Sequence, residues 1–174
     1  MLYLAIISMC MIFGGLTSAY VVRSGDPGWL HFDLPNAFYI STAIIISSSF
    51  TMLWALLAAK KDNFSGVKIG MILTLILGMA FVVSQFKAWG ALVDNGIFLG
   101  GKDSNAAGQF LYVISFAHLL HLAGGIIMLI YVCIKSLKQL YHSKNLLGLQ
   151  LCSIYWHFLD LLRIYLFVFI YFAH

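Results

Sequence analysis

Ionisable side chains inside apolar stretches are the residues of this sequence that could do chemistry. Burying such a group costs free energy unless it is paired, so each is a candidate for function or for a buried contact. Six of them stand well inside the apolar segments: Lys87, His118, His121, His157, Asp160 and Arg163. What they can do depends on which of them share a face.

His118 and His121 are three residues apart and share a face if this stretch is helical. Two imidazoles are an incomplete metal site, and the carboxylate-rich pattern of di-iron bundles is absent. We therefore predict interhelical hydrogen bonds. Metal binding, lipid or proton contact, and a haem shared with His157 are the alternatives. Ala117 and Gly125 flank His121 at four residues on either side, which lets another helix approach closely.

His157, Asp160 and Arg163 recur every three residues near the C-terminus. An unpaired guanidinium at the centre of a membrane helix costs about 2.5–3.5 kcal/mol on insertion scales. We therefore predict an ion pair between Asp160 and Arg163, with His157 in the same structural network. A proton relay is the alternative.

Lys87 lies roughly two turns before the end of its apolar segment, close enough for its stem to reach the membrane interface. We predict that it does so. A contact with an anionic lipid headgroup, or with an acid of a neighbouring subunit, is the alternative.

The composition identifies the environment that must position these residues. The chain has 174 residues, 10 Lys and Arg, 6 Asp and no Glu; 62% of it is hydrophobic, and its mean hydropathy is +0.96. A soluble domain carries about 25% charged residues, against 9% here. This excludes an ordinary soluble enzyme, a disordered chain and a nucleic-acid binder. The three Cys show no CxxC spacing, so no disulfide framework or thiolate metal site is expected.

Five apolar segments are each long enough to span a membrane, which takes about 20 residues. They are Met1–Val22, Asn36–Ala59, Val67–Val93, Gln109–Ile134 and Gly148–Ala173. Both Pro residues and many of the charges fall in the connectors between them. We therefore predict an all-α, polytopic membrane protein, with residues 1–174 forming one five-helix domain.

The lysines predict an orientation. Six of the basic residues lie in or beside the second and fourth connectors, and two lie in the first and third. The six are Lys60, Lys61, Lys68, Lys135, Lys138 and Lys144, and the two are Arg23 and Lys102. Because positive charge stays on the cytoplasmic side, the N-terminus is predicted inside and the C-terminus outside. Interface aromatics are predicted to be Trp29 and Trp89 outside, and Trp54 and Trp156 inside.

The last segment carries the clearest family likeness. Residues 155–160 read Tyr-Trp-His-Phe-Leu-Asp, which resembles the signature Tyr-Trp-His-Phe-Val-Asp of subunit III of the haem-copper terminal oxidases. Three further stretches are similar to that family in the same order. They are Ala-Ile-Ile-Ser at 5–8 with Phe-Gly-Gly at 13–15, the stretch from Gly78 to Gln85, and His-Leu-Leu-His at 118–121 followed by Gly125.

The resemblance implies an accessory, non-catalytic subunit of a respiratory cytochrome c oxidase, which reduces dioxygen to water and pumps protons. Such a subunit packs against subunit I, which holds the haems and copper. It stabilises the assembly, supports proton uptake and binds phospholipids. It carries no cofactor or metal of its own. A multi-pass position in the bacterial plasma membrane is expected, rather than in the mitochondrial inner membrane.

The matching positions are His118, His121, Trp156, His157 and Asp160. The resemblance implies that they fix the bundle and its lipid or subunit contacts. Subunit III of a quinol oxidase and the related subunit of nitric oxide reductase are close alternatives. A small transporter or proton channel is a distant one, since it predicts inverted repeats that this sequence lacks.

The sequence departs from the family pattern in three ways. The long form of the family has seven helices, with a lipid cleft between the first two and the remaining five, and the first two would precede Met1. Met9 stands where relatives usually carry a buried Glu. Arg163 stands where the family often has Trp. Any role that needs the carboxyl at Met9 is therefore not expected of this chain.

Overall fold

The computed structural model describes residues 1–25, 27, 36–102, 105–138 and 146–173. This part of the chain contains five α-helices and no strand. They are α1 (Leu2–Arg23), α2 (Asn36–Lys60), α3 (Phe64–Asp94), α4 (Ala106–Leu137) and α5 (Leu147–Phe172). All five are long and apolar enough to cross a membrane, and even α1, with 22 residues, is about 33 Å long. The prediction of an all-α chain with five helices long enough to span a membrane is confirmed for the described residues.

Short polar caps begin two of the helices. The Asn63 side chain accepts a hydrogen bond from the Gly66 amide at 3.2 Å at the start of α3. The Asn105 side chain accepts one from the Ala107 amide at 2.9 Å at the start of α4. Such caps satisfy amides that have no partner inside the helix, so the apolar stretches become helices with defined starting points.

Helices α2 and α3 make the most extensive contact of any described pair. A Cβ added at Gly66 would lie 2.8 Å from the Cβ of Ala58, and one added at Gly70 would lie 2.6 Å from that of Ala55. Small residues face each other on both helices, so the two backbones approach closely. Such close packing of small residues is a usual basis of helix association in lipid, because apolar side chains gain little by exchanging lipid for another helix.

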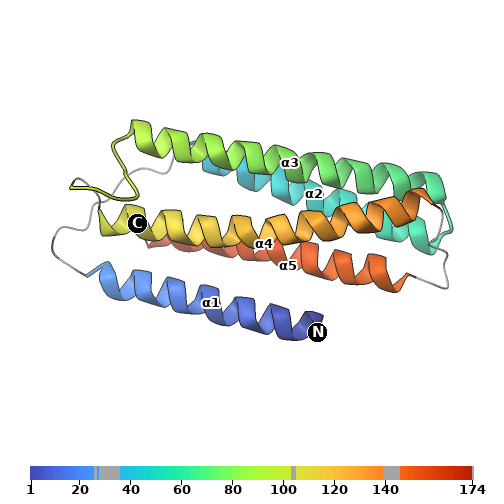
Figure 1. Ribbon diagram of the computed structural model, residues 1–174, viewed down its shortest axis with the longest axis horizontal. Coiled ribbons are helices and arrows are strands. Elements are labelled where there is room, and N and C mark those ends of the chain that lie inside the picture. The colour runs from blue at the N-terminus through green and yellow to red at the C-terminus, as the bar shows by residue number, and fades with distance from the viewer. Residues whose placement is uncertain (26, 28–35, 103–104, 139–145, 174) are drawn as a thin grey trace.

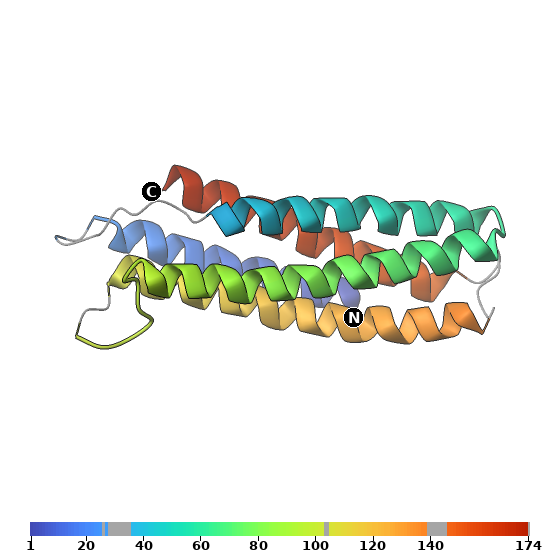
Figure 2. The same cartoon turned by 90° about the horizontal axis from the view of Figure 1, so that it is seen from above.

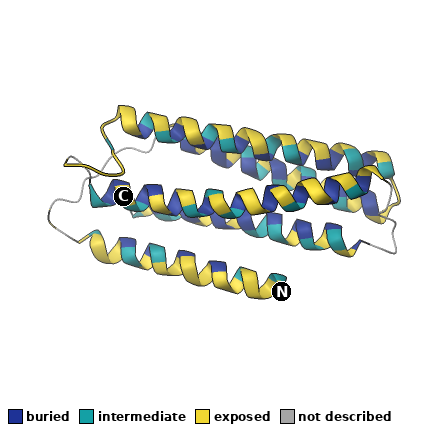
Figure 3. Ribbon diagram, viewed as in Figure 1, coloured by how far each residue is buried: buried dark blue, intermediate teal, exposed yellow. Residues whose placement is uncertain are grey.

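The helices form a four-helix bundle with a fifth helix beside it (Figure 1). Successive helices run antiparallel, and α1 runs parallel to α5 (Figures 1 and 2). Among the described helices, α1 contacts α4 and α5 and makes no contact with α2 or α3. Figure 3 shows that α1 is exposed over most of its length. Its buried residues form one stripe: Met9, Phe13, Thr17 and Tyr20.

Candidate functional site

The inner face of α5 carries three side chains in a row, two from the family signature and one just after it. Trp156, Asp160 and Arg163 are spaced four and three residues apart, which places them on one face of a helix. They are 0%, 3% and 2% exposed. His157 is half-buried at the edge of this face. Because Trp156 is wholly buried, its prediction as an interface aromatic is wrong; Trp29 lies outside the described residues.

Trp156 fits into a slot formed by two other helices. Its indole Nε1 donates to Ser48 Oγ at 3.1 Å, and the Ser48 hydroxyl donates to the Ile45 carbonyl at 2.7 Å. A Cβ added at Gly78 would lie 2.9 Å from the edge of the indole ring. The ring therefore joins α5 to α2 by a hydrogen bond and to α3 by a close contact that only glycine allows.

Arg163 bridges α5 to the same two helices. Its Nη2 donates to Ser41 Oγ and to Gln85 Oε1, each at 3.2 Å. The guanidinium carbon lies 5.4 Å from the ring centroid of Phe38 and 5.3 Å from that of Phe81, within the range of cation–π attraction. Two neutral acceptors and two aromatic rings thus surround the charge.

The predicted ion pair between Asp160 and Arg163 is wrong for the described structure. Neither carboxylate oxygen of Asp160 has a hydrogen-bond partner among the described residues, although the Ser49 hydroxyl interacts with this carboxyl. Ser49, beside Asp160, and Ser41, beside Arg163, are eight residues apart on α2, about 12 Å along its axis. The two side chains of α5 therefore have different neighbours on α2.

His157 belongs to the Asp160 end of this face. Its Nδ1 shares a hydrogen bond with Ser49 Oγ at 2.5 Å, and its Nε2 has no partner among the described residues. The prediction that His157 joins a network with Asp160 therefore has a basis in Ser49, which contacts both. Arg163 is not part of that network.

The described structure does not show the hydrogen bonds to other helices that were predicted for the two histidines of α4. His118 is 1% exposed, and neither ring nitrogen has a partner in the part of the chain described. Its ring is edge-on to Phe13 and Phe81. His121 Nδ1 donates back to the Ala117 carbonyl of its own helix at 2.7 Å. The Phe13 ring lies edge-on to both imidazoles.

The contact between α4 and α5 uses the backbone beside these histidines. The Tyr155 hydroxyl donates to the backbone carbonyl of His121 at 2.9 Å. A Cβ added at Gly125 would lie 3.0 Å from the Tyr155 ring and 3.1 Å from Leu159. The predicted close approach of another helix at Gly125 is confirmed.

Lys87 lies on α3 and is exposed, with no hydrogen bond or ion pair among the described residues. It faces away from the bundle, and its proposed reach to the interface stays a prediction. Among the described residues, no three His, Cys or Asp side chains come together as metal ligands would. The expectation that this chain holds no cofactor or metal likewise stays a prediction.

Sequence reasoning missed the partners of the α5 face: Ser41, Ser48 and Ser49 of α2. For α3 a signal was present. Gly78 and Gln85 are seven residues apart, as are Trp156 and Arg163, and each α3 residue contacts the corresponding α5 residue. Equal spacing on two parallel helices indicates matched contacts.

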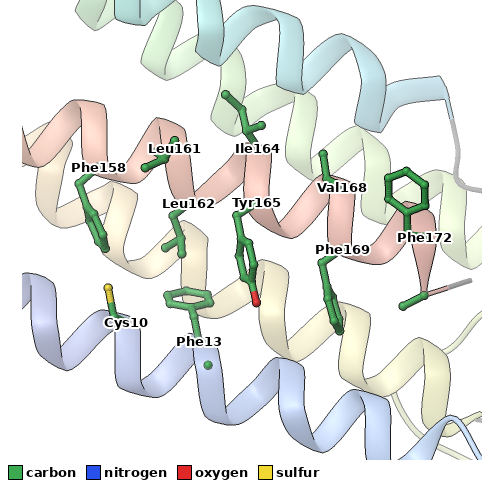
Figure 4. Close-up of a pocket in the computed structure, with 12 residues that line it drawn as sticks. Cys10, Phe13, Phe158, Leu161, Leu162, Ile164, Tyr165, Val168, Phe169 and Phe172 are labelled. Carbon is green, nitrogen blue, oxygen red and sulfur yellow. The ribbon is translucent and has the colours of Figure 1, made fainter.

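An apolar groove between α1 and α5 was also missed (Figure 4). It has a volume of about 890 Å³. The α1 side is formed by Cys10, Phe13 and Gly14, and the α5 side extends from Phe158 to Ala173. The Tyr165 hydroxyl in its wall is within hydrogen-bond distance, 3.3 Å, of Thr17 Oγ. Because almost all of its other lining side chains are apolar, the groove offers almost only hydrocarbon surface.

Comparisons with known proteins agree with the signature. A sequence model of the family described as cytochrome c oxidase subunit III matches residues 30–174. Cytochrome c oxidase subunit 3 of Corynebacterium diphtheriae is 30% identical over 170 residues, covering 93% of this chain and 81% of that protein. The subunit 3 of Thermostichus vulcanus is 31% identical over 175 residues, covering 95% and 82%. The probable subunit 3 of Nocardia farcinica is 30% identical over 172 residues, covering 95% and 83%. This chain belongs to the cytochrome c oxidase subunit III family.

Proposed function

We propose that this accessory oxidase subunit supports the respiratory complex structurally, in the plasma membrane of a bacterium, and that subunit I is its main contact. Subunit I would carry the haems and copper, and this chain none. The observation that carries the proposal is the use of two buried side chains of α5, one inside the family signature and one just after it. Trp156 and Arg163 are both engaged in contacts between helices of this chain.

Support of proton uptake is proposed to be indirect. A relay needs a continuous chain of hydrogen-bonded polar groups across the membrane. In the described structure, the pair His157–Ser49 and the group around Arg163 are separate, and His118 has no hydrogen bond. The chain would therefore act by stabilising its partner and not by conducting protons itself.

The orientation is part of the proposal. Basic residues gather at the end of the bundle where α2 and α4 finish and α3 begins. These are Lys60, Lys61, Lys68, Lys135 and Lys138; Lys144 lies outside the described residues. The positive-inside rule then places the N-terminus in the cytoplasm and the C-terminus outside. Labelling a cysteine introduced at Lys61 from either side of sealed vesicles tests this.

The groove between α1 and α5 supports the proposal that this subunit binds phospholipid. Its walls are apolar and lie at membrane depth along α5 from Phe158 to Ala173, about 22 Å. An acyl chain can lie along such a surface without leaving a polar group unsatisfied. Mass spectrometry of the detergent-solubilised subunit, released without delipidation, should detect retained phospholipid, and replacing Gly14 with Leu should reduce it.

The deciding experiment is purification in a mild detergent. A tagged chain should bring with it a larger multi-helix protein that shows haem absorption, while the chain separated from it should show no Soret band. Failure to recover any haem protein would count against the proposal. A stoichiometric haem on the separated chain would overturn the assignment of His118, His121 and His157 as structural.

A further inference from the structure

We propose that the bundle core around Arg163 binds one small anion of halide size. The site is the Arg163 layer, defined as Ser41 of α2, Gln85 of α3, Ser115 and His118 of α4, and Arg163 of α5. The proposal is independent of the role of this chain in an oxidase. It rests on register, charge and unused donors.

The contacts place these residues at one level of the bundle. Arg163 contacts Ser41 and Gln85 directly. The Phe81 ring lies beside both the guanidinium, at 5.3 Å, and the His118 ring, at 6.0 Å. From Phe81 to Gln85 is one turn along α3, and from His118 to Ser115 is about one turn along α4. Because α3 and α4 run antiparallel, both steps lead toward the same end of the bundle (Figure 1).

The charge of the layer is not neutralised within the described part of the chain. Both hydrogen bonds of Nη2 go to uncharged acceptors. The carboxyl nearest in sequence, that of Asp160, has no hydrogen-bond partner among the described residues and interacts with Ser49, which lies about two turns from Ser41 along α2. A buried guanidinium without an acid is strongly disfavoured in a low-dielectric interior, so a negative ion is the ligand that this layer favours.

The same layer holds donors with no acceptor among the described residues. They are Gln85 Nε2, Ser115 Oγ, Arg163 Nε and the protonated ring nitrogen of His118. All four residues are at most 2% exposed. Two acceptor oxygens of the layer, Ser41 Oγ and Gln85 Oε1, already accept from Arg163, and among the unused groups Gln85 Nε2 and Arg163 Nε can only donate. Buried donors normally have partners, so the missing partner is an acceptor.

The burial of the Arg163 layer limits how large that acceptor can be. No residue of the layer is exposed enough for a lipid headgroup or a partner's side chain to reach it. Water would supply an acceptor but no charge, and a metal cation would add to the positive charge. A halide accepts several hydrogen bonds and neutralises the guanidinium, which satisfies both requirements at once.

The test uses the full chain in mild detergent with any subunits that it retains. When chloride replaces gluconate at constant ionic strength, the thermal midpoint should rise by roughly 3 °C, because a ligand that binds only the folded state stabilises it. Equilibrium dialysis with radioactive iodide should find one bound ion per chain. No chloride response and no bound iodide would overturn the proposal and leave water as the partner of these donors.

Two variants separate the site from a general salt effect. Gln85→Glu places a carboxylate where Gln85 Oε1 now accepts from Arg163, so it should raise the midpoint in gluconate and abolish both the chloride response and iodide binding. Lys87→Met removes an exposed cation of the same helix and should leave both unchanged. An unaltered chloride response in Gln85→Glu, or a lost one in Lys87→Met, would contradict the site.

Discussion

The Arg163 layer and the groove beside α1 are both parts of this molecule where α5 meets other helices, and they are joined in opposite ways. In the layer, Arg163 donates to side chains of two other helices and lies against two aromatic rings. At the groove, the hydroxyls of Thr17 and Tyr165 form a polar link between α1 and α5, at 3.3 Å. Apolar contacts there include the edge-on packing of Tyr20 on Phe169.

This difference shows what holds helices together in lipid. Apolar surface gains little by moving from lipid to another helix, so close packing and hydrogen bonds decide which helices stay together. Helices α2 to α5 have both, whereas α1 has few of either. We therefore expect the four-helix bundle to be rigid and α1 to be the element that separates at least cost. The following predictions test this contrast.

The largest effect is expected at Trp156. Trp156→Ala removes a fully buried indole between three helices and should lower the free energy of unfolding by about 3–5 kcal/mol. Trp54→Ala is the matched control, because Trp54 is 48% exposed on α2, and it should change stability by less than about 0.5 kcal/mol. Unfolding in mixed micelles measures both. Equal losses would mean that the bundle core is not the stable region.

A smaller loss is expected when the slot for Trp156 is filled. Gly78→Ala places a methyl group 2.9 Å from a rigid ring and should cost about 1–3 kcal/mol. Gly90→Ala, on the same helix, meets nothing within 4 Å and should be neutral or slightly stabilising. Thermal unfolding of the two variants side by side checks this, and a harmless Gly78→Ala would contradict the close contact of Gly78 with the Trp156 ring.

Loosening α1 should cost least. Tyr165→Phe removes the polar link to Thr17 and should lower the unfolding free energy by about 0.6 kcal/mol, the average for an interhelical hydrogen bond in a membrane. Spin labels on α1 and α5 should then show a wider distribution of separations. Tyr171→Phe, at a residue that is 56% exposed, is the control and should alter neither quantity.

The smallest effect is expected for the energetic coupling between Asp160 and Arg163. Because the two groups face different hydroxyls of α2, the effects of Asp160→Asn and Arg163→Leu on stability should add to within about 0.5 kcal/mol. A double-mutant cycle in mixed micelles measures this. A coupling above roughly 1 kcal/mol would show that the charges pair after all.

Much of the fold was predictable because hydrophobicity is a local property. A run of about 20 apolar residues spans a membrane whatever its neighbours are, so all five helices were predicted to within a few residues of their observed bounds. The signature at residues 155–160 was equally local and indicated the family that the comparisons confirm. The small residue Gly125 indicated close packing because only its size mattered.

The pairing of polar groups was not predictable in this way. Spacing alone placed Asp160 and Arg163 on one face, and an ion pair followed from their charges. The sequence does not say how α2 and α3 are rotated against α5, and that rotation presents Ser49 to one group and Ser41 and Gln85 to the other. For the same reason, His118 was assigned hydrogen bonds and instead lies between two phenyl rings.

The sequence by itself therefore determined that this chain forms five helices long and apolar enough to span a membrane, and which family it belongs to. Only the tertiary structure decided what each buried group contacts, that α1 stands beside the bundle, and that a groove separates it from α5. The reason is physical: crossing a membrane depends on the composition of one segment, whereas a contact depends on the rotation and register of two.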